Sequence, residues 1–172
     1  KNTCKNLKKS FFSQGITQYK NNAKNIPFLI LAAGPSLQDI LPHLKEIKNK
    51  AIIVCVDTAL RFCIKYNVEP DFIVLTDPQY WAYKHIDGIK SPSSILITES
   101  AVYPSVFRFL CKKIICCKSN FPLEHYFDSF RSEKGTLVAG GSVASTAWNF
   151  AQYAGASEIY VAGLDLAFPN KQ

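Results

Sequence analysis

The feature that most constrains the fold is a series of short apolar runs that recur along the 172-residue chain. Their hydrophobic residues are continuous and do not alternate with polar ones, which indicates strands that are buried on both faces. Strands of this kind belong to parallel sheets that are covered by helices. The runs occupy residues 27–33, 51–56, 71–76, 94–98, 113–117 and 158–162.

Between these runs, the spacing of the apolar residues changes to the helical period. From Ser36 to Lys48, for example, apolar side chains recur at intervals of three and four residues. This alternation of strands and helices predicts an α/β, Rossmann-like fold with a mostly parallel sheet flanked by helices. The predicted helices occupy residues 36–48, 58–66, 80–88, 104–111, 121–130 and 142–154.

Charge is distributed unevenly along the chain. Six of the 20 Lys and Arg residues, and none of the 13 acidic residues, lie in residues 1–24. We therefore expect a basic helical arm or linker over residues 1–24 and one Rossmann-like nucleotide-binding domain over residues 25–172. The domain itself is almost neutral, so nucleic acid is not an expected partner. Two interpretations of the arm stay open: a solvated helix that packs on a neighbour, and a segment that binds anions.

Simple features of the chain exclude several classes of protein. The longest apolar run, residues 26–33, is far shorter than the roughly 20 residues of a membrane-spanning helix. The basic start of the chain lacks the apolar segment of a secretory signal. The six cysteines show no metal-ligand spacing, and Cys55, Cys116 and Cys117 lie in apolar runs, so we expect free core thiols in a cytoplasmic protein. Because the chain begins without Met and stops at Gln172, we expect a piece of a longer protein.

Ligands of open parallel sheets bind beyond the carboxyl ends of the strands, so the residues that follow each predicted strand are the candidate site. These residues are Gly34-Pro35-Ser36, Asp57, Asp77, Glu99 and Asp165. Three of the five positions carry Asp, which is more acid than neutral connecting loops require.

The turn Gly34-Pro35-Ser36 is the first candidate for phosphate binding. Gly34 lets a ligand approach the backbone, Pro35 sets the start of the following helix, and Ser36 with Asp39 has the spacing of a capping box. Free N–H groups at a helix start favour phosphate. The same residues would also make an ordinary tight turn between a strand and a helix, so both interpretations stay open.

The turn Gly140-Gly141-Ser142 repeats this pattern before the last predicted helix. Its two glycines allow the backbone to pass close to a ligand, and Ser142 supplies a hydroxyl at the helix start. A plain helix cap after a flexible loop is the alternative. We predict that both turns contact a nucleotide or a sugar.

The acids after the strands are candidates for different roles. Asp57 follows the second strand, where a Rossmann acid binds ribose hydroxyls; helix capping is its alternative role. Asp77 and Asp165 are candidates for catalysis and for holding a divalent cation such as Mg²⁺, and Asp165 is also a candidate for nucleotide binding. Solvated loop acids are the alternative. Tyr80, Trp81 and Tyr83 could stack on a base or sugar, or pack in the core.

With these residues in view, the sequence resembles the Maf (motility accessory factor) family of flagellin-modifying transferases, whose central domain is similar to bacterial sialyltransferases. The segments that carry the resemblance cover most of residues 27–168, in the family's order. They are residues 30–37 (ILAAGPSL), 51–60 (AIIVCVDTAL), 70–79 (PDFIVLTDPQ), 140–144 (GGSVA) and 161–167 (VAGLDLA). A second resemblance, to archaeal-type 6-hydroxymethylpterin pyrophosphokinase, rests on the same turns.

The Maf resemblance implies a cytoplasmic glycosyltransferase that moves a nonulosonic acid from its CMP-activated form to Ser or Thr of flagellin. It implies contacts from the two glycine turns and Asp57 to the nucleotide-sugar. In the similar sialyltransferases the catalytic His follows the Gly-x-Asp segment, a position that would lie beyond Gln172 here. The second resemblance implies a diphosphate transferase that uses ATP and Mg²⁺, with Asp77 and Asp165 as metal ligands. A non-catalytic module that docks flagellin or a chaperone is the third interpretation.

Overall fold

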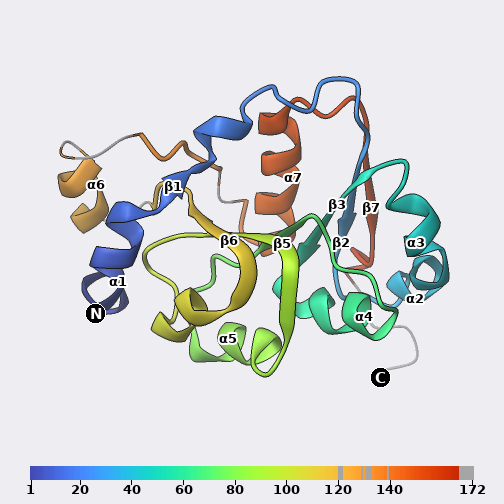
Figure 1. The fold of residues 1–172 in the computed structure, drawn as a ribbon, viewed down its shortest axis with the longest axis horizontal. Helices are drawn as coiled ribbons and strands as arrows, with labels where there is room; N and C mark the ends of the chain where they lie inside the picture. The colour runs from blue at the N-terminus through green and yellow to red at the C-terminus, as the bar shows by residue number, and fades with distance from the viewer. Residues whose placement is uncertain (120–121, 129, 131–132, 139, 167–172) are drawn as a thin grey trace.

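The computed structural model describes residues 1–119, 122–128, 130, 133–138 and 140–166. These residues form a seven-stranded sheet in which every strand pairing is parallel. The strand order is β1-β6-β5-β4-β3-β2-β7 (Figure 1). The strands are β1 (Gln14–Gly15), β2 (Phe28–Leu31), β3 (Ile52–Val56), β4 (Phe72–Val74), β5 (Lys90–Thr98), β6 (Leu110–Cys116) and β7 (Ile159–Ala162).

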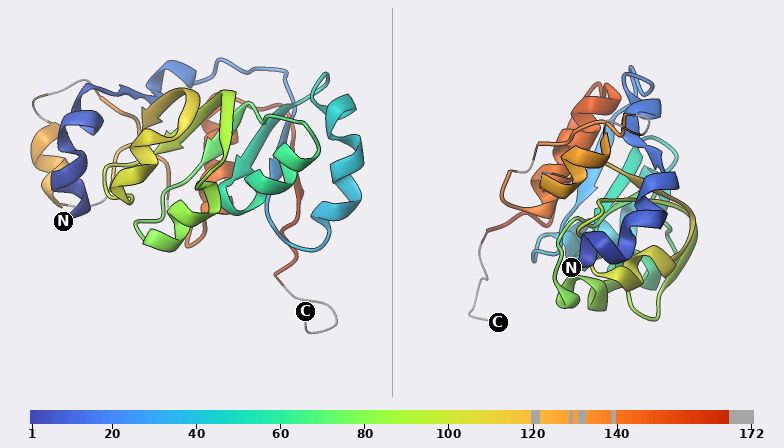
Figure 2. Two further views of the ribbon diagram at one scale, coloured as in Figure 1. Left: turned by 60° about the horizontal axis from the view of Figure 1, so that its bottom comes forward. Right: turned by 90° about the vertical axis from the view of Figure 1, so that its left-hand side faces the viewer.

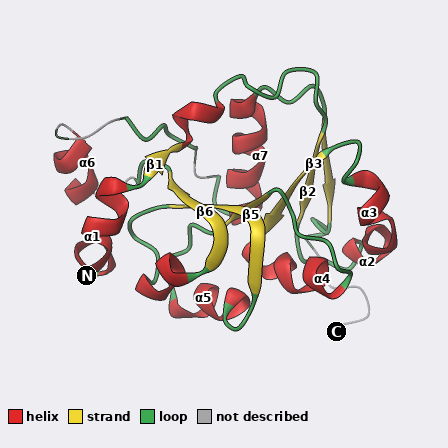
Figure 3. Cartoon of the chain, in the orientation of Figure 1, coloured by secondary structure: helices red, strands yellow, loops and turns green. Residues whose placement is uncertain are grey.

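Helices and short 3-10 turns connect the strands and flank the sheet (Figure 3). This confirms the predicted α/β, Rossmann-like class, and the six predicted strands are all present. The α-helices are α1 (Asn2–Phe12), α2 (Leu37–Ile40), α3 (Leu44–Ile47), α4 (Leu60–Lys65), α5 (Tyr80–Ile86), α6 (Pro122–Asp128) and α7 (Val143–Ala154). The 3-10 helices are η1 (Ile16–Tyr19), η2 (Leu41–His43), η3 (Asp57–Ala59) and η4 (Pro104–Arg108).

Strand β7 marks a reversal in the order of the sheet. From β2 to β6 each new strand is added on one side, whereas β7 pairs with the other side of β2. Right-handed crossovers place the connecting helices on opposite faces before and after such a reversal. Accordingly, Figure 2 shows α7 on one side of the strands and α5 on the other. Phe150 anchors α7 to the sheet, since its ring lies 4.7 Å from that of Phe72.

Two of the predicted helices are shorter or tighter than expected. The helix predicted over residues 36–48 is divided into α2, η2 and α3, and Pro42 lies at the division because proline cannot donate a helical hydrogen bond. The helix predicted over residues 104–111 is the 3-10 helix η4. The helix predicted over residues 121–130 is α6, and residues 121 and 129 lie outside the described part.

The basic arm is attached to the domain. Asn6 Nδ2 donates hydrogen bonds to the carbonyl oxygens of Ser100 (2.9 Å) and Val102 (2.8 Å), and the Asn6 side chain is buried. The short strand β1, which the sequence did not predict, extends the sheet beside β6. Within the described chain, every helix is too short or too polar to cross a bilayer, and the six cysteines are free thiols.

Candidate functional site

A cleft of about 300 Å³ lies at the carboxyl ends of β2, β3 and β4, beside the start of α7. Asp57 lies directly after β3, and Asp77 lies in the segment after β4. Helix α5 contributes Trp81 and His85. Ser142 and the first turn of α7 form the facing wall. A volume of this size lies at the lower end of the range for small-molecule sites.

The start of α7 is organised as a capping box. The Ser142 hydroxyl accepts a hydrogen bond from the Ser145 N–H (3.2 Å), and the Ser145 hydroxyl accepts one from the Ser142 N–H (3.3 Å). The next two N–H groups, of Val143 and Ala144, have no acceptor among the described residues, and both residues line the cleft. A 12-residue helix therefore presents the positive end of its dipole to the cleft.

The two glycines before α7 have different reasons to be glycine. A Cβ on Gly140 would lie 2.6 Å from the Ser145 hydroxyl, so a larger residue would disturb the capping box. Gly141 has a φ of +83°, a conformation that favours glycine, and the space around it is open. Gly141 also lines a small hollow next to the cleft, together with Asp77 and Thr146.

Asp57 is the buried acid of the cleft, with 4% of its surface exposed. Burial raises the pKa of Asp57 to about 6, and the neighbouring His85 partly offsets this by lowering it, whereas the carboxylate of Asp77 raises it. These interactions show that the three groups share one electrostatic environment. The sequence did not single out His85, because an isolated histidine on a short helix carries no signal until the fold places that helix at the cleft.

The turn Gly34-Pro35-Ser36 is arranged differently. The Ser36 N–H donates a hydrogen bond to Asp165 Oδ2 (3.0 Å), and the Ser36 hydroxyl accepts one from the Gly163 N–H (3.1 Å). The predicted capping box with Asp39 does not form, because the Ser36 side chain makes no cap to its own helix. None of the three turn residues lines the cleft, so their contact with a nucleotide stays a prediction.

Asp77 and Asp165 are separated by the strand order. They follow β4 and β7, with β3 and β2 between those strands, and the Asp165 carboxylate lies against the Ser36 N–H after β2. A metal site shared by these two acids stays a prediction. The structure instead brings Asp77 close to Asp57 in the cleft. No group of three or more metal-binding side chains occurs in the part of the chain that is described.

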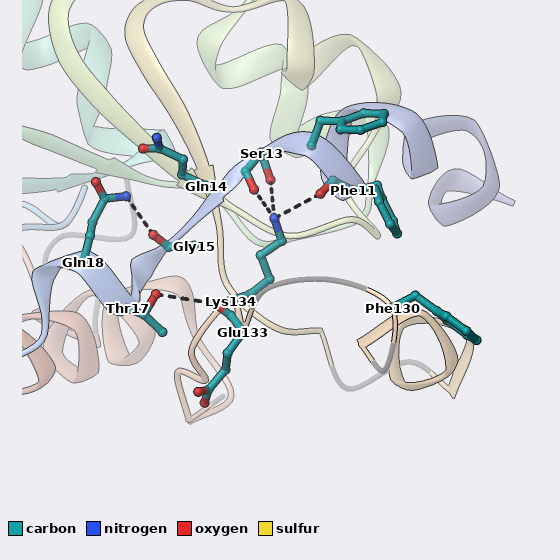
Figure 4. A pocket seen from close by; sticks show the side chains of 10 residues that line it. Phe11, Ser13, Gln14, Gly15, Thr17, Gln18, Phe130, Glu133 and Lys134 are labelled. Atoms are coloured by element: carbon teal, nitrogen blue, oxygen red, sulfur yellow. Dashed lines mark hydrogen bonds between the residues drawn. The ribbon is translucent and has the colours of Figure 1, made fainter.

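A larger hollow, of about 880 Å³, lies at the other end of the sheet beside β1 (Figure 4). Lys134 is the one lysine among the described residues that line it, and it is used structurally, since its Nζ donates to the carbonyl oxygens of Ser13 and Phe11 at the end of α1. Phe12 and Phe130 form exposed parts of its wall. This hollow combines open aromatic surface with a lysine that is already hydrogen-bonded, whereas the smaller cleft gathers the candidate catalytic groups.

Comparison with protein families gives a match along nearly the whole chain. A family model described as "6-hydroxymethylpterin diphosphokinase MptE-like" matches residues 1–171. Two relatives from Treponema pallidum (strain Nichols), both described as uncharacterized, are 40% identical over 117 residues and 30% identical over 115 residues. The matches cover 60% and 66% of this chain but only 30% and 26% of the relatives.

A solved structure shares the fold. It is a Maf glycosyltransferase from Magnetospirillum magneticum AMB-1, with a TM-score of 0.74 and 22% sequence identity. The similarity covers 92% of this chain and 28% of the other. Together the comparisons confirm the two resemblances that were noted from the sequence segments, and they give the chain a glycosyltransferase-like fold.

Proposed function

Because this chain belongs to the 6-hydroxymethylpterin diphosphokinase MptE-like family, we propose that its cleft binds a nucleotide-activated sugar and that the chain is part of a glycosyltransferase. The observation that carries the proposal is the meeting of three features in one cleft. These are the free N–H groups at the start of α7, the buried acid Asp57 and the exposed ring of Trp81.

Each feature suits one part of a nucleotide. The N–H groups of Val143 and Ala144 would receive the phosphate, because the helix start carries partial positive charge. Asp57 follows β3, next to β2, which is where a Rossmann acid accepts hydrogen bonds from ribose hydroxyls. Trp81 is 70% exposed and would stack on the base.

The same arrangement supports the chemistry of glycosyl transfer. The bond between the anomeric carbon and the phosphate oxygen breaks, and its electron pair leaves with the nucleotide phosphate. The start of α7 would stabilise this developing charge. The acceptor hydroxyl attacks the anomeric carbon and loses its proton to a base. His85 and Asp77 both line the cleft and are the candidates for this role.

The identity of the donor and the acceptor comes from the Maf resemblance of the sequence segments. On that basis the donor is a CMP-activated nonulosonic acid and the acceptor is a Ser or Thr hydroxyl of flagellin. The chain spans about 30% or less of the length of the proteins it matches, so the activity of the whole protein belongs to the proposal. A cytoplasmic location accompanies it, because free core thiols suit a reducing compartment.

Tryptophan fluorescence tests the cleft directly, because the chain has only two tryptophans. In Trp148→Phe the remaining reporter is Trp81 in the cleft, whereas in Trp81→Phe it is Trp148, which does not line the cleft. We expect CMP to quench the fluorescence of Trp148→Phe and to leave that of Trp81→Phe unchanged. Equal quenching of both variants, or of neither at millimolar CMP, would reject the cleft as the site.

A second function, diphosphate transfer from ATP, is favoured by the proximity of Asp57 and Asp77. Two carboxylates that share a cleft are a suitable set for Mg²⁺, which commonly uses one or two carboxylates together with phosphate oxygens. Bound there, Mg²⁺ would offset the negative charge of the phosphates. ATP binding that requires Mg²⁺ and is abolished by EDTA, with no response to CMP, would replace the first proposal by this one.

The third interpretation, a docking module without catalysis, predicts a different pattern. Neither CMP nor ATP with Mg²⁺ would then change the fluorescence of Trp148→Phe or the melting temperature. Immobilised protein would nevertheless retain flagellin from a purified solution, and Asp57→Asn would retain it equally well.

A further inference from the structure

A second hollow at the carboxyl edge of the sheet is lined by basic residues. It measures about 440 Å³ and lies between the start of α1 and the segment that joins β5 to β6. Lys1, which precedes α1, and Lys5 of α1 line one wall, and Arg108 lines the other from the end of η4. Tyr103 and Ser105 add hydroxyl groups. Among the described residues that line it none is acidic, so three cations surround one hollow without a carboxylate from that part of the chain.

These cations have no ion-pair partner in the described part of the chain. Other cations of the protein do form ion pairs, and these are Lys48 with Asp71, Lys50 with Glu46 and Lys84 with Asp87. Positive charges that are held near one another without a counter-charge repel each other. A bound anion would remove that repulsion, and the basic residues of this pocket are therefore available to a ligand.

The walls of the pocket are held in place by hydrogen bonds. Asn2 Nδ2, on α1, donates to the carbonyl oxygens of Pro78 (3.0 Å), before α5, and Ala101 (3.1 Å), after β5. The buried Asn6 donates to two further carbonyls of the segment after β5. On the facing wall, Arg108 Nη2 donates to the Ser105 hydroxyl (2.7 Å). The basic groups thus project from elements whose positions are already fixed, which lowers the entropy cost of binding.

Helix α5 separates this pocket from the cleft. Tyr103, in the wall of the basic pocket, packs against Tyr80 (5.2 Å between ring centroids) and Tyr83 (5.6 Å) of α5. The same helix carries Trp81 and His85 in the wall of the cleft. An anion bound in the basic pocket would consequently occupy a different position from a phosphate bound at the start of α7.

We propose that this pocket is a binding site for an anionic group, a phosphate or a carboxylate, separate from the nucleotide cleft. The guanidinium of Arg108 offers paired donors that match the geometry of either oxyanion, and the ammonium of Lys5 adds a point charge from the facing wall. The site does not depend on the reaction assigned to the cleft, since none of its residues lines that cleft.

Thermal melting at constant ionic strength tests the site, with inorganic pyrophosphate as the phosphate probe and citrate as the carboxylate probe. We expect at least one probe to raise the Tm of the unmodified chain. Arg108→Gln, Lys5→Gln and the double variant should lose most of that rise. Both substitutions are at exposed positions, so the three variants should fold. The probe that acts identifies the chemistry of the ligand.

Two controls make the result specific. Lys24→Gln removes an equally exposed charge that does not line the pocket, and Asp57→Asn alters the cleft; both should keep the full response. The proposal is overturned if neither probe raises the Tm. It is equally overturned if the double variant responds as strongly as the unmodified chain, or if Asp57→Asn alone abolishes the response.

Discussion

The two glycine turns look alike in the sequence and differ in the structure. Gly34-Pro35-Ser36 follows β2 and leads into α2, which has four residues, whereas Gly140-Gly141-Ser142 leads into α7, which has 12. In the first turn the carboxylate of Asp165 accepts the Ser36 N–H. In the second, the serine caps its own helix and the N–H groups that follow face the cleft.

This difference shows what a glycine-serine turn requires before it can hold a ligand. The N–H group of the first turn already binds an anion, which is the carboxylate of Asp165 after β7. The second turn has a long helix behind it and open space in front of it, so both the dipole and the room for a ligand are present. Similar sequence patterns therefore lead to an internal contact in one case and to an accessible surface in the other.

The largest expected effect is on stability, when a glycine of each turn is replaced by alanine. In Gly34→Ala the new Cβ would meet the Asp165 carboxylate and lie 2.6 Å from the Gly163 carbonyl oxygen, so we expect a loss of about 3 kcal/mol in the free energy of unfolding. Gly141→Ala meets no atom within 4 Å and carries only the strain of a φ of +83°, about 1 kcal/mol. Urea denaturation of both variants measures the difference, and equal losses would contradict it.

Glu99, which follows β5, is a third position at the carboxyl ends of the strands that can be compared with the two turns. Burial raises the pKa of Glu99 from 4.5 to about 7, with the nearby Ser119 side chain lowering it and the neighbouring Glu124 raising it further. The folded state therefore holds this proton more tightly than the unfolded state does. Its contribution to stability is complete below about pH 4.5 and is lost as the pH rises through about 7.

Glu99→Gln should remove that dependence. We expect the variant to exceed the unmodified chain in stability by about 2 kcal/mol at pH 8, relative to their difference at pH 4.5. Chemical denaturation at both pH values measures the change. A variant whose stability runs parallel to that of the unmodified chain across this range would show that Glu99 ionises freely in the folded protein.

The affinity for CMP distinguishes the cleft beside the second turn from the first turn. Asp57→Asn should weaken CMP binding about tenfold, or about 1.4 kcal/mol, because a carboxylate that accepts ribose hydroxyls is replaced by an amide. Asp165→Asn, which alters the acid bound to Ser36, should lower stability and leave the affinity within about twofold. Isothermal titration with CMP checks both. A larger loss of affinity in Asp165→Asn would move the site to the first turn.

The smallest expected effect concerns the cap of α7. Ser142→Ala should cost about 1 kcal/mol, because the Ser145 N–H loses its acceptor. Ser142→Asp keeps an acceptor and should restore the stability, but its charge should weaken CMP binding at the same helix start. Urea denaturation and CMP titration of the two variants measure these opposite effects. Normal CMP affinity in Ser142→Asp would indicate that the phosphate lies elsewhere.

The sequence by itself determined the class of the fold and most of its strands. Continuous apolar runs have one stable solution, burial between helices in a parallel sheet, and this signal is local and repeated. It also predicted Asp57 and Asp77 from the rule that ligands bind beyond the carboxyl ends of strands, and Ser142 from its glycine turn, and the structure places all three at one cleft. The two-residue strand β1 was missed because so short a strand has no periodicity of its own.

Only the tertiary structure decided which of these residues meet. The strand order sets Asp77 apart from Asp165 and brings it to Asp57, and the packing of α5 adds Trp81 and His85. Pairing of Asp165 with Ser36 joins residues that are 129 positions apart, and no local pattern encodes such a contact. Residue type and spacing can be read from a single segment. Whether an N–H group already has an acceptor depends on which distant segments the fold places next to it.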